Sequence, residues 1–100
     1  MKKMKIMVVC GFGLGSSMVL KMTLDDVLKE ESIDREIETF CVDSYTASGQ
    51  DYDLVFTSNE LLYLFDNAKQ PKIVIENFLS KDEIREKGLA LIKQYLDDNK

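Results

Sequence analysis

The sequence predicts an α/β fold with one four-stranded parallel sheet, doubly wound by helices, in the strand order 2-1-3-4. Two observations lead to this prediction. Short apolar segments alternate with segments of helical periodicity, and three of the five glycines lie directly after the first apolar segment. Such alternation produces parallel strands joined by right-handed crossovers, with helices on both faces of the sheet. Because a chain of 100 residues builds one hydrophobic core, we expect a single domain over residues 1–100.

The first half of the chain supplies two predicted strands and one long helix. Residues 5–9 form an almost continuously apolar segment, which is typical of a strand buried on both faces of a sheet. Residues 16–31 have helical spacing, and Ser16 and Ser17 are candidates for the N-cap of this helix. Residues 36–42 alternate only in part and predict a half-exposed strand. The predicted core face of the helix consists of Leu20, Leu24, Val27 and Leu28.

The second half repeats the alternation with shorter elements. Residues 54–57 predict the third strand, a helix follows at residues 60–66, and residues 72–75 predict the fourth strand. The last helix begins at Ser80, whose spacing to Glu83 fits a capping box. Its predicted core face consists of Ile84, Gly88, Leu91, Ile92 and Tyr95. In sheets of this kind ligands bind beyond the carboxyl ends of the strands, which is where the glycine cluster lies.

The composition excludes several classes of function. The chain carries 13 Lys and Arg against 18 Asp and Glu, a net charge of −5, which argues against a nucleic-acid partner. No apolar run approaches the roughly 20 residues that cross a bilayer and no signal-peptide core follows the basic start, so we expect a cytoplasmic protein. The absence of histidine excludes Ser–His and Cys–His catalysis and His-ligated metals, and two cysteines alone form no zinc site. We expect neither a metal nor another cofactor.

The segment from Cys10 to Ser17 combines a thiol, a glycine-rich turn and a helix start. Glycines adopt positive φ and have no Cβ, so consecutive N–H groups converge on an anion, and the helix N-terminus adds further donors. The residues of this predicted phosphate-binding loop are Gly11, Phe12, Gly13, Leu14, Gly15, Ser16 and Ser17. Such surroundings favour the thiolate of Cys10. A thiolate in a phosphate-shaped loop is a phosphoryl acceptor.

Other glycine-rich motifs fit this segment less well. Ser16 stands where the dinucleotide fingerprint has its third glycine, and no lysine follows Gly15 as in the nucleotide P-loop. Low-molecular-weight tyrosine phosphatases use Cys-x5-Arg, but Ser16 occupies the arginine position, and Pro71 lacks the preceding acidic residue of their Asp-Pro pair. The missing groups are those that speed hydrolysis, so the loop predicts a phosphoryl carrier. A small cysteine-dependent phosphatase and a non-catalytic, flavodoxin-like anion-binding regulatory module remain alternatives.

With these motifs in place, the chain resembles enzyme IIB of the bacterial phosphoenolpyruvate-dependent sugar phosphotransferase system, on its galactitol–ascorbate side. The resemblance depends on Cys10-Gly11-x-Gly13-x-Gly15-Ser16-Ser17-Met18 with Lys21-Met22, and more weakly on Asn77-x-Leu79-Ser80. It is strongest for the ascorbate-specific group, and length and element order agree over essentially the whole chain. It implies a flavodoxin-like fold with a phosphatase-like loop.

The resemblance also implies a phosphotransferase activity. Enzyme IIA would pass a phosphoryl group from its phosphohistidine to Cys10, and phosphocysteine would give it to a sugar, ascorbate-like by this resemblance, bound in the membrane enzyme IIC. Cys10 is then the catalytic nucleophile and residues 11–17 bind the phosphate. The missing histidine fits this scheme, because the histidine belongs to enzyme IIA.

Four further features have more than one interpretation. Met18 and Met22 lie one helical turn apart and form either peripheral core or, with Lys21, a docking patch for two partners. Cys41 is interpreted as structural, the alternative being an oxidised pair with Cys10 that blocks phosphorylation. Residues 43–51 form a loop on the ligand side, to which no chemistry is assigned.

Overall fold

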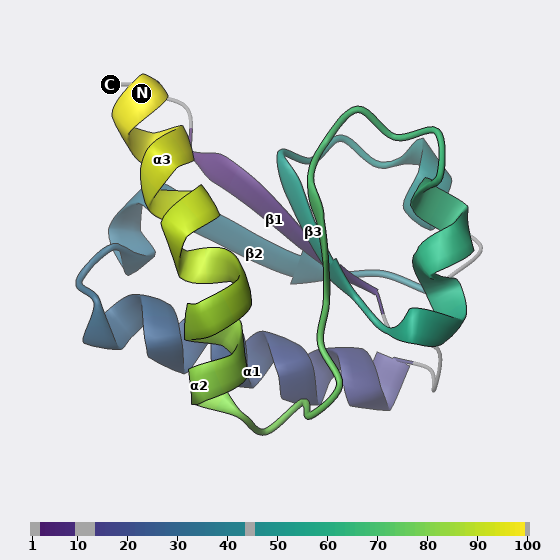
Figure 1. Ribbon diagram of the computed structural model, residues 1–100, viewed down its shortest axis with the longest axis horizontal. Helices are drawn as coiled ribbons and strands as arrows, with labels where there is room; N and C mark the ends of the chain where they lie inside the picture. Colours follow the sequence, from purple (N-terminus) through teal and green to yellow (C-terminus); the bar gives the residue numbers. More distant parts are fainter. Residues whose placement is uncertain (1–2, 10–13, 44–45, 100) are drawn as a thin grey trace.

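The computed structural model describes residues 3–9, 14–43 and 46–99 (Figure 1). Its strands are β1 (Met4–Val9), β2 (Ile37–Cys41), β3 (Leu54–Thr57) and β4 (Lys72–Val74). Its helices are α1 (Leu14–Glu30), α2 (Lys81–Ile84) and α3 (Ala90–Asp98). Short 3₁₀ helices occupy Asp34–Glu36, Ala47–Gly49 and Asn59–Phe65, and a π-helical turn at Arg85–Leu89 joins α2 to α3.

The four strands form one parallel sheet in the order β2-β1-β3-β4, which confirms the predicted topology. The central strand is β1, which pairs with β2 from Met4 to Val8 and with β3 from Ile6 to Val9. A strand with neighbours on both sides and helices above and below has no exposed edge, which explains its apolar sequence. The half-exposed character predicted for the second strand is also confirmed, because only Ile37 in β2 is buried.

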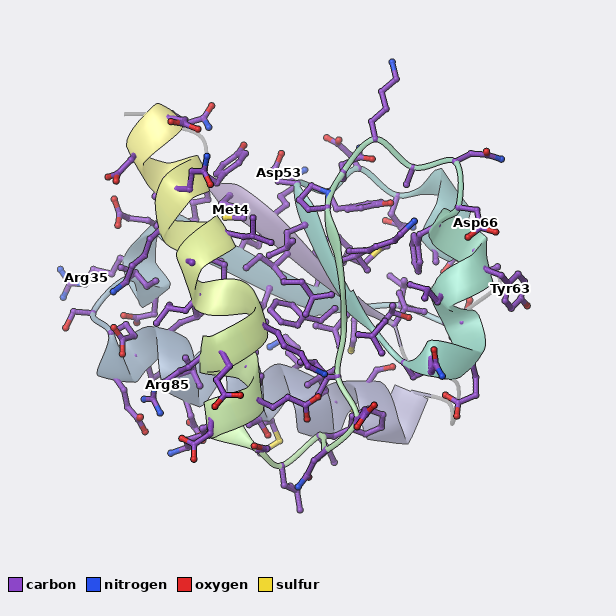
Figure 2. The ribbon with its side chains drawn as sticks, viewed as in Figure 1. Met4, Arg35, Asp53, Tyr63, Asp66 and Arg85 are labelled. Atoms are coloured by element: carbon purple, nitrogen blue, oxygen red, sulfur yellow. The ribbon has the colours of Figure 1, made fainter. Side chains whose placement is uncertain are left out.

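Alternate residues of β1 enter two separate cores, one on each face of the sheet. Met4, Ile6 and Val8 pack with α1 and the last helix, whereas Met7 and Val9 pack under the 3₁₀ helices. Figure 2 shows side chains filling both spaces, while Tyr63 points outward from the sheet. Among the described residues no helix combines the length and apolarity needed to span a membrane.

Three details of the helices differ from the sequence prediction. The first helix begins at Leu14, so Ser16 and Ser17 lie inside its first turn and the N-cap prediction for them is wrong. The second predicted helix, at residues 60–66, is a 3₁₀ helix of seven residues, Asn59–Phe65. The predicted core position of Leu91 is also wrong, since this side chain is 40% exposed. The π-helical turn before it adds a residue to the turn and rotates Leu91 out of the core.

The π-helical turn brings the last helix close to the sheet. Gly88 lies in this turn, and a Cβ at that position would lie 2.7 Å from Cζ of Phe56 in β3. Ile84, directly before the turn, and Ile92, three residues after it, are both buried. A side chain at residue 88 would therefore push the helix off the sheet.

Candidate functional site

The candidate site lies at the carboxyl edge of the sheet, where β1 and β3 end side by side. Val9, the last residue of β1, pairs with Thr57, the last residue of β3. The predicted nucleophile, Cys10, follows Val9 in the chain, and Cys10, Gly11, Phe12 and Gly13 lie outside the described residues. What the structure describes of the site is therefore its frame: the two strand ends and the start of α1.

The described part of the predicted phosphate-binding loop belongs to the first turn of α1. Leu14, Gly15, Ser16 and Ser17 begin this helix of 17 residues. The backbone N–H groups of a first helical turn have no partner within the helix, and the positive end of the helix dipole lies there. Both features favour an anion at this place.

Buried hydroxyl groups surround the same place. Ser17, Thr57 and Ser58 are buried; Thr57 ends β3 and Ser58 follows it. Sequence reasoning missed Thr57 and Ser58 as site residues. The signal was present, because the ends of neighbouring parallel strands meet at one edge of a sheet.

The two methionines singled out from the sequence are exposed. Met18 is 54% exposed and Met22 is 64% exposed, so neither is core. They lie on α1 close to its first turn and share this surface with Leu79, which is 75% exposed. The hydroxyl of Thr23 donates to the backbone carbonyl of Phe78 at 2.7 Å and thereby fixes the loop before α2 against α1.

Lys21 has a partner within the molecule. Its Nζ donates to Oδ2 of Asp25 at 2.9 Å, and the other oxygen of Asp25 accepts from Oγ1 of Thr39 in β2 at 2.6 Å. This chain of bonds ties α1 to β2. Lys21 therefore positions the helix, and its charge is already neutralised in the isolated chain.

A hollow of about 310 Å³ opens between the ends of β3 and β4. It is lined by Ser58, Asn59, Glu60, Ile75, Glu76 and Phe78. Glu60 and Glu76 form no ion pair within the described part of the chain. The carboxyl edge thus combines an anion-favouring helix start with two uncompensated carboxylates farther along.

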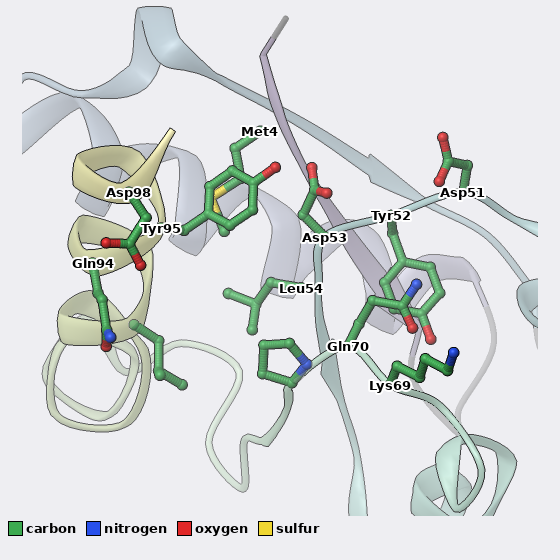
Figure 3. Close-up of a pocket in the computed structure, with 12 residues that line it drawn as sticks. Met4, Asp51, Tyr52, Asp53, Leu54, Lys69, Gln70, Gln94, Tyr95 and Asp98 are labelled. Carbon is green, nitrogen blue, oxygen red and sulfur yellow. The ribbon is translucent and has the colours of Figure 1, made fainter. Parts of the chain in front are cut away.

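A larger hollow, about 490 Å³, lies at the opposite, amino edge of the sheet (Figure 3). Asp53 stands in it and accepts the backbone N–H of Lys5 at 2.8 Å. Burial, together with the hydrogen bond and charge of Asp53, raises the pKa of Tyr95. Asp51 and Asp98 also line this hollow, which makes it unfavourable for a phosphate. Within the described ranges, no three acidic or cysteine side chains are grouped to hold a metal ion.

Cys41 is a free thiol of intermediate exposure. It pairs with Val8 in the neighbouring strand and packs against the core on the α1 face of the sheet. These contacts support the structural interpretation of Cys41. Its pairing with Cys10 stays untested, because Cys10 lies outside the described residues.

A buried central strand followed by a helix that begins at the carboxyl edge defines a parallel α/β domain. The family model described as "PTS system, Lactose/Cellobiose specific IIB subunit" matches residues 5–88. The chain therefore belongs to the enzyme IIB family of the sugar phosphotransferase system, as the sequence motifs indicated. Components of this family are phosphotransferases, and in general they work with enzyme IIA and a membrane enzyme IIC.

Individual relatives agree with this assignment. The ascorbate-specific EIIB components of Salmonella typhimurium and Escherichia coli O157:H7 are each 29% identical over 92 residues, which cover 91% of this chain and 91% of theirs. The lactose-specific IIB domain of Streptococcus pneumoniae has a similar structure, with a TM-score of 0.60 and 14% identity. It covers 93% of this chain and 97% of that domain, and at this identity it supports the fold alone.

Proposed function

We propose that this chain is the cytoplasmic phosphoryl carrier of a sugar transporter, with Cys10 as the residue that carries the phosphoryl group. The observation that supports this most is the position of residue 10 in the chain, directly after the buried central strand and four residues before the start of α1. Both elements converge on the edge where helix N–H groups favour an anion. A thiol at this position has the environment that lowers thiol pKa values in other proteins.

The transfer takes place in two steps. First, the thiolate of Cys10 forms a phosphorus–sulfur bond while the phosphorus–nitrogen bond of the phosphohistidine of enzyme IIA breaks. Then a hydroxyl of a sugar bound by enzyme IIC displaces the sulfur, its proton passes to a base or to water, and Cys10 leaves as thiolate. Through both steps the N–H groups of residues 11–17 hold the phosphoryl oxygens.

The sugar is ascorbate-like in this proposal. Its support is the ascorbate-specific naming of relatives that are 29% identical over most of the chain. The family model has a different label, lactose and cellobiose, so the sugar needs its own measurement. Phosphorylation of ascorbate, lactose and cellobiose by membranes with the cognate enzyme IIC would identify it.

Met18 and Met22 are the proposed contacts for partner proteins. Both are exposed beside the start of α1, and unbranched methionine side chains adapt to differently shaped surfaces. A carrier that meets a donor and an acceptor in turn needs such adaptability. Lys21 contributes to docking only when its ion pair with Asp25 opens.

One assay tests the proposal against its alternatives. The purified chain is incubated with phosphoenolpyruvate, the general phosphotransferase proteins and the cognate enzyme IIA. The wild type should gain one phosphoryl group per chain on sulfur, and Cys10→Ser should lose uptake to background, because a hydroxyl is a poor nucleophile at neutral pH. The matched variant Cys41→Ser should keep uptake within about twofold of wild type, since the partly buried Cys41 packs against the core on the α1 face of the sheet.

Three results would contradict the proposal. Label mapped to Cys41 or to a serine would place the nucleophile elsewhere. Sustained hydrolysis of p-nitrophenyl phosphate would identify a phosphatase. Binding of inorganic phosphate with no covalent label would identify an anion-binding module.

A further inference from the structure

Leu79 is the most exposed large apolar side chain among the described residues, at 75%. It lies in the loop of residues 76–80 between β4 and α2, part of the Asn77-x-Leu79-Ser80 motif that the phosphoryl site does not explain. Single exposed leucines are common on protein surfaces and need no explanation. What distinguishes Leu79 is the hydrogen bonding of the loop that holds it.

The loop is held at both of its ends. The N–H groups of Glu76 and Asn77 donate to the two carboxylate oxygens of Glu83 in α2, each at 2.8 Å. Oδ1 of Asn77 accepts the N–H of Leu79 at 3.0 Å, and Oγ of Ser80 accepts the N–H of Glu83 at 3.1 Å. Glu83 thus bonds the loop rather than completing the predicted capping box.

The middle of the loop is fixed as well. The hydroxyl of Thr23 donates to the carbonyl of Phe78, the residue before Leu79. Partial burial opposes the charge of Glu83, but hydrogen bonds from Lys87 and from the N–H groups of the loop outweigh it and lower the pKa of Glu83. The clamp is therefore ionised and intact at neutral pH.

A rigid loop changes the cost of binding. A loop backbone that is already held in place loses little conformational entropy when a partner covers the side chain that it carries. An interface anchor is a side chain that becomes fully covered at the centre of a contact, surrounded by weaker contacts that exclude water. Leu79 lies next to Phe78, and Met22 lies next to Thr23, so the bond between Thr23 and Phe78 brings the loop and the methionine surface of α1 together.

The charges near this surface select the kind of partner. Glu60 and Glu76 line the adjoining hollow without an ion pair among the described residues. Of the nearby lysines, Lys21 is paired with Asp25, and Lys81 shares the carboxylate of Glu30 with Arg85. The surface is apolar with a negative border, and its complement is an apolar pocket bordered by Lys and Arg.

We infer that Leu79 is the docking anchor for the cytoplasmic face of the membrane enzyme IIC, an inference that rests on the proposed function. Cytoplasmic loops of membrane proteins carry an excess of Lys and Arg. A chain with net charge −5 is repelled by the anionic inner leaflet, so its contact with the membrane runs through those basic loops. The surface of residues 76–80 has the matching apolar and acidic chemistry.

The test compares Leu79→Ser with Leu91→Ser, since Leu91 is also an exposed leucine, 40% exposed, but lies by the amino-edge hollow. Uptake from phosphorylated enzyme IIA and sugar phosphorylation by vesicles with enzyme IIC are measured against carrier concentration. Leu79→Ser should raise the KM of the second step about tenfold or more, as loss of an interface anchor does, and leave uptake within about twofold. Leu91→Ser should leave both steps within about twofold of wild type.

A second variant tests the charges. Glu60→Gln with Glu76→Gln should raise the same KM at low salt and have little effect at high salt, where exposed charges are screened. Sedimentation of the unphosphorylated chain with vesicles gives a readout independent of transfer: vesicles with enzyme IIC should bind wild type and Leu91→Ser, and bind Leu79→Ser weakly.

The outcomes separate this inference from the proposed function. An equal loss of both transfer steps in Leu79→Ser would assign the surface to enzyme IIA, and no change in either step would remove Leu79 as an anchor. If the chain bound vesicles that lack enzyme IIC, the surface of residues 76–80 would be assigned to lipid binding. The wild type could also bind vesicles with enzyme IIC through Leu79 and yet take up no phosphoryl group. That result would support the docking surface and overturn the carrier function.

Discussion

The two edges of the sheet differ in the size of their hollows and in the groups that lie beside them. The amino edge holds the larger hollow, about 490 Å³, and its central carboxylate, Asp53, is already hydrogen-bonded to the backbone of Lys5. The carboxyl edge has a smaller hollow, about 310 Å³, next to buried hydroxyls and the first turn of α1. The size of a hollow is therefore a poor guide to the site in this molecule. The direction of the strands is a better one, because it decides where helix N-termini and strand ends meet.

We expect the phosphoryl site at one edge because of the helix starts. In a parallel sheet with helical crossovers, each helix that follows a strand begins at the carboxyl edge and brings its N–H groups there. Carboxylates line the hollows of both edges, Asp51, Asp53 and Asp98 at the amino edge and Glu60 and Glu76 at the carboxyl edge, so the helix start is what distinguishes them. Changes away from the carboxyl edge should accordingly alter stability and leave transfer per folded molecule unchanged.

The largest stability effect is expected at Gly88, between the two edges. Gly88→Ala would place a methyl group 2.7 Å from Phe56 and force the last helix or the ring to move. We expect a loss of about 1–3 kcal/mol in the free energy of unfolding, measured by urea denaturation. Gly49→Ala is the control, since its Cβ would meet nothing within 4 Å. If each folded Gly88→Ala molecule took up less phosphoryl group than wild type, packing in the interior would be coupled to the carboxyl edge. The expectation that changes away from this edge alter stability alone would then be wrong.

A smaller effect is expected at the amino edge itself. Asp53→Asn weakens the acceptor of the Lys5 N–H and of the Tyr95 hydroxyl, and should cost about 1 kcal/mol. Thermal unfolding measures the loss, with Asp66→Asn at an exposed position as control. Uptake from enzyme IIA should equal that of wild type. A defect in uptake with little loss of stability would instead make the larger hollow part of the functional site.

The smallest effect concerns pH and the ion pairs between α1 and the last helix. Hydrogen bonds from Lys81 and Arg85 lower the pKa of Glu30 below 4.5. A carboxylate with a lowered pKa in the folded state stabilises above its unfolded pKa, and that stability is lost as the pH falls through the folded value. Glu30→Gln should therefore melt slightly below wild type at neutral pH, and the difference should vanish in acid.

The control for this pH experiment is Glu36→Gln, because Glu36 forms no ion pair among the described residues. Its melting temperature should follow that of wild type at every pH. A difference between Glu30→Gln and wild type that persists in strong acid would show that the glutamate acts by packing and not by charge.

The sequence predicted the sheet order correctly, because this depends on the alternation of strands and helices. It failed where tertiary contacts decide. Helical spacing placed Leu91 in the core. Spacing alone cannot show the extra residue of the π-helical turn, in which Gly88 lies close to Phe56. The ion pair of Lys21 with Asp25 is a local pair at i,i+4 spacing, which helical spacing offers. The bond from Thr39 to the same carboxylate comes from another strand and could not be predicted from spacing. The chemistry of the loop from Cys10 to Gly13 stays a prediction.

The central position of β1 has a consequence for the nascent chain. This strand precedes both of its pairing partners, since β2 begins at Ile37 and β3 at Leu54. On the ribosome, β1 is thus an apolar strand with two bare hydrogen-bonding edges until β2 has been made, and with one bare edge until residue 57 has been made. Such strands invite aggregation or chaperone capture. The speed of translation between residues 42 and 57 therefore sets how long the most buried strand of the fold stays unprotected.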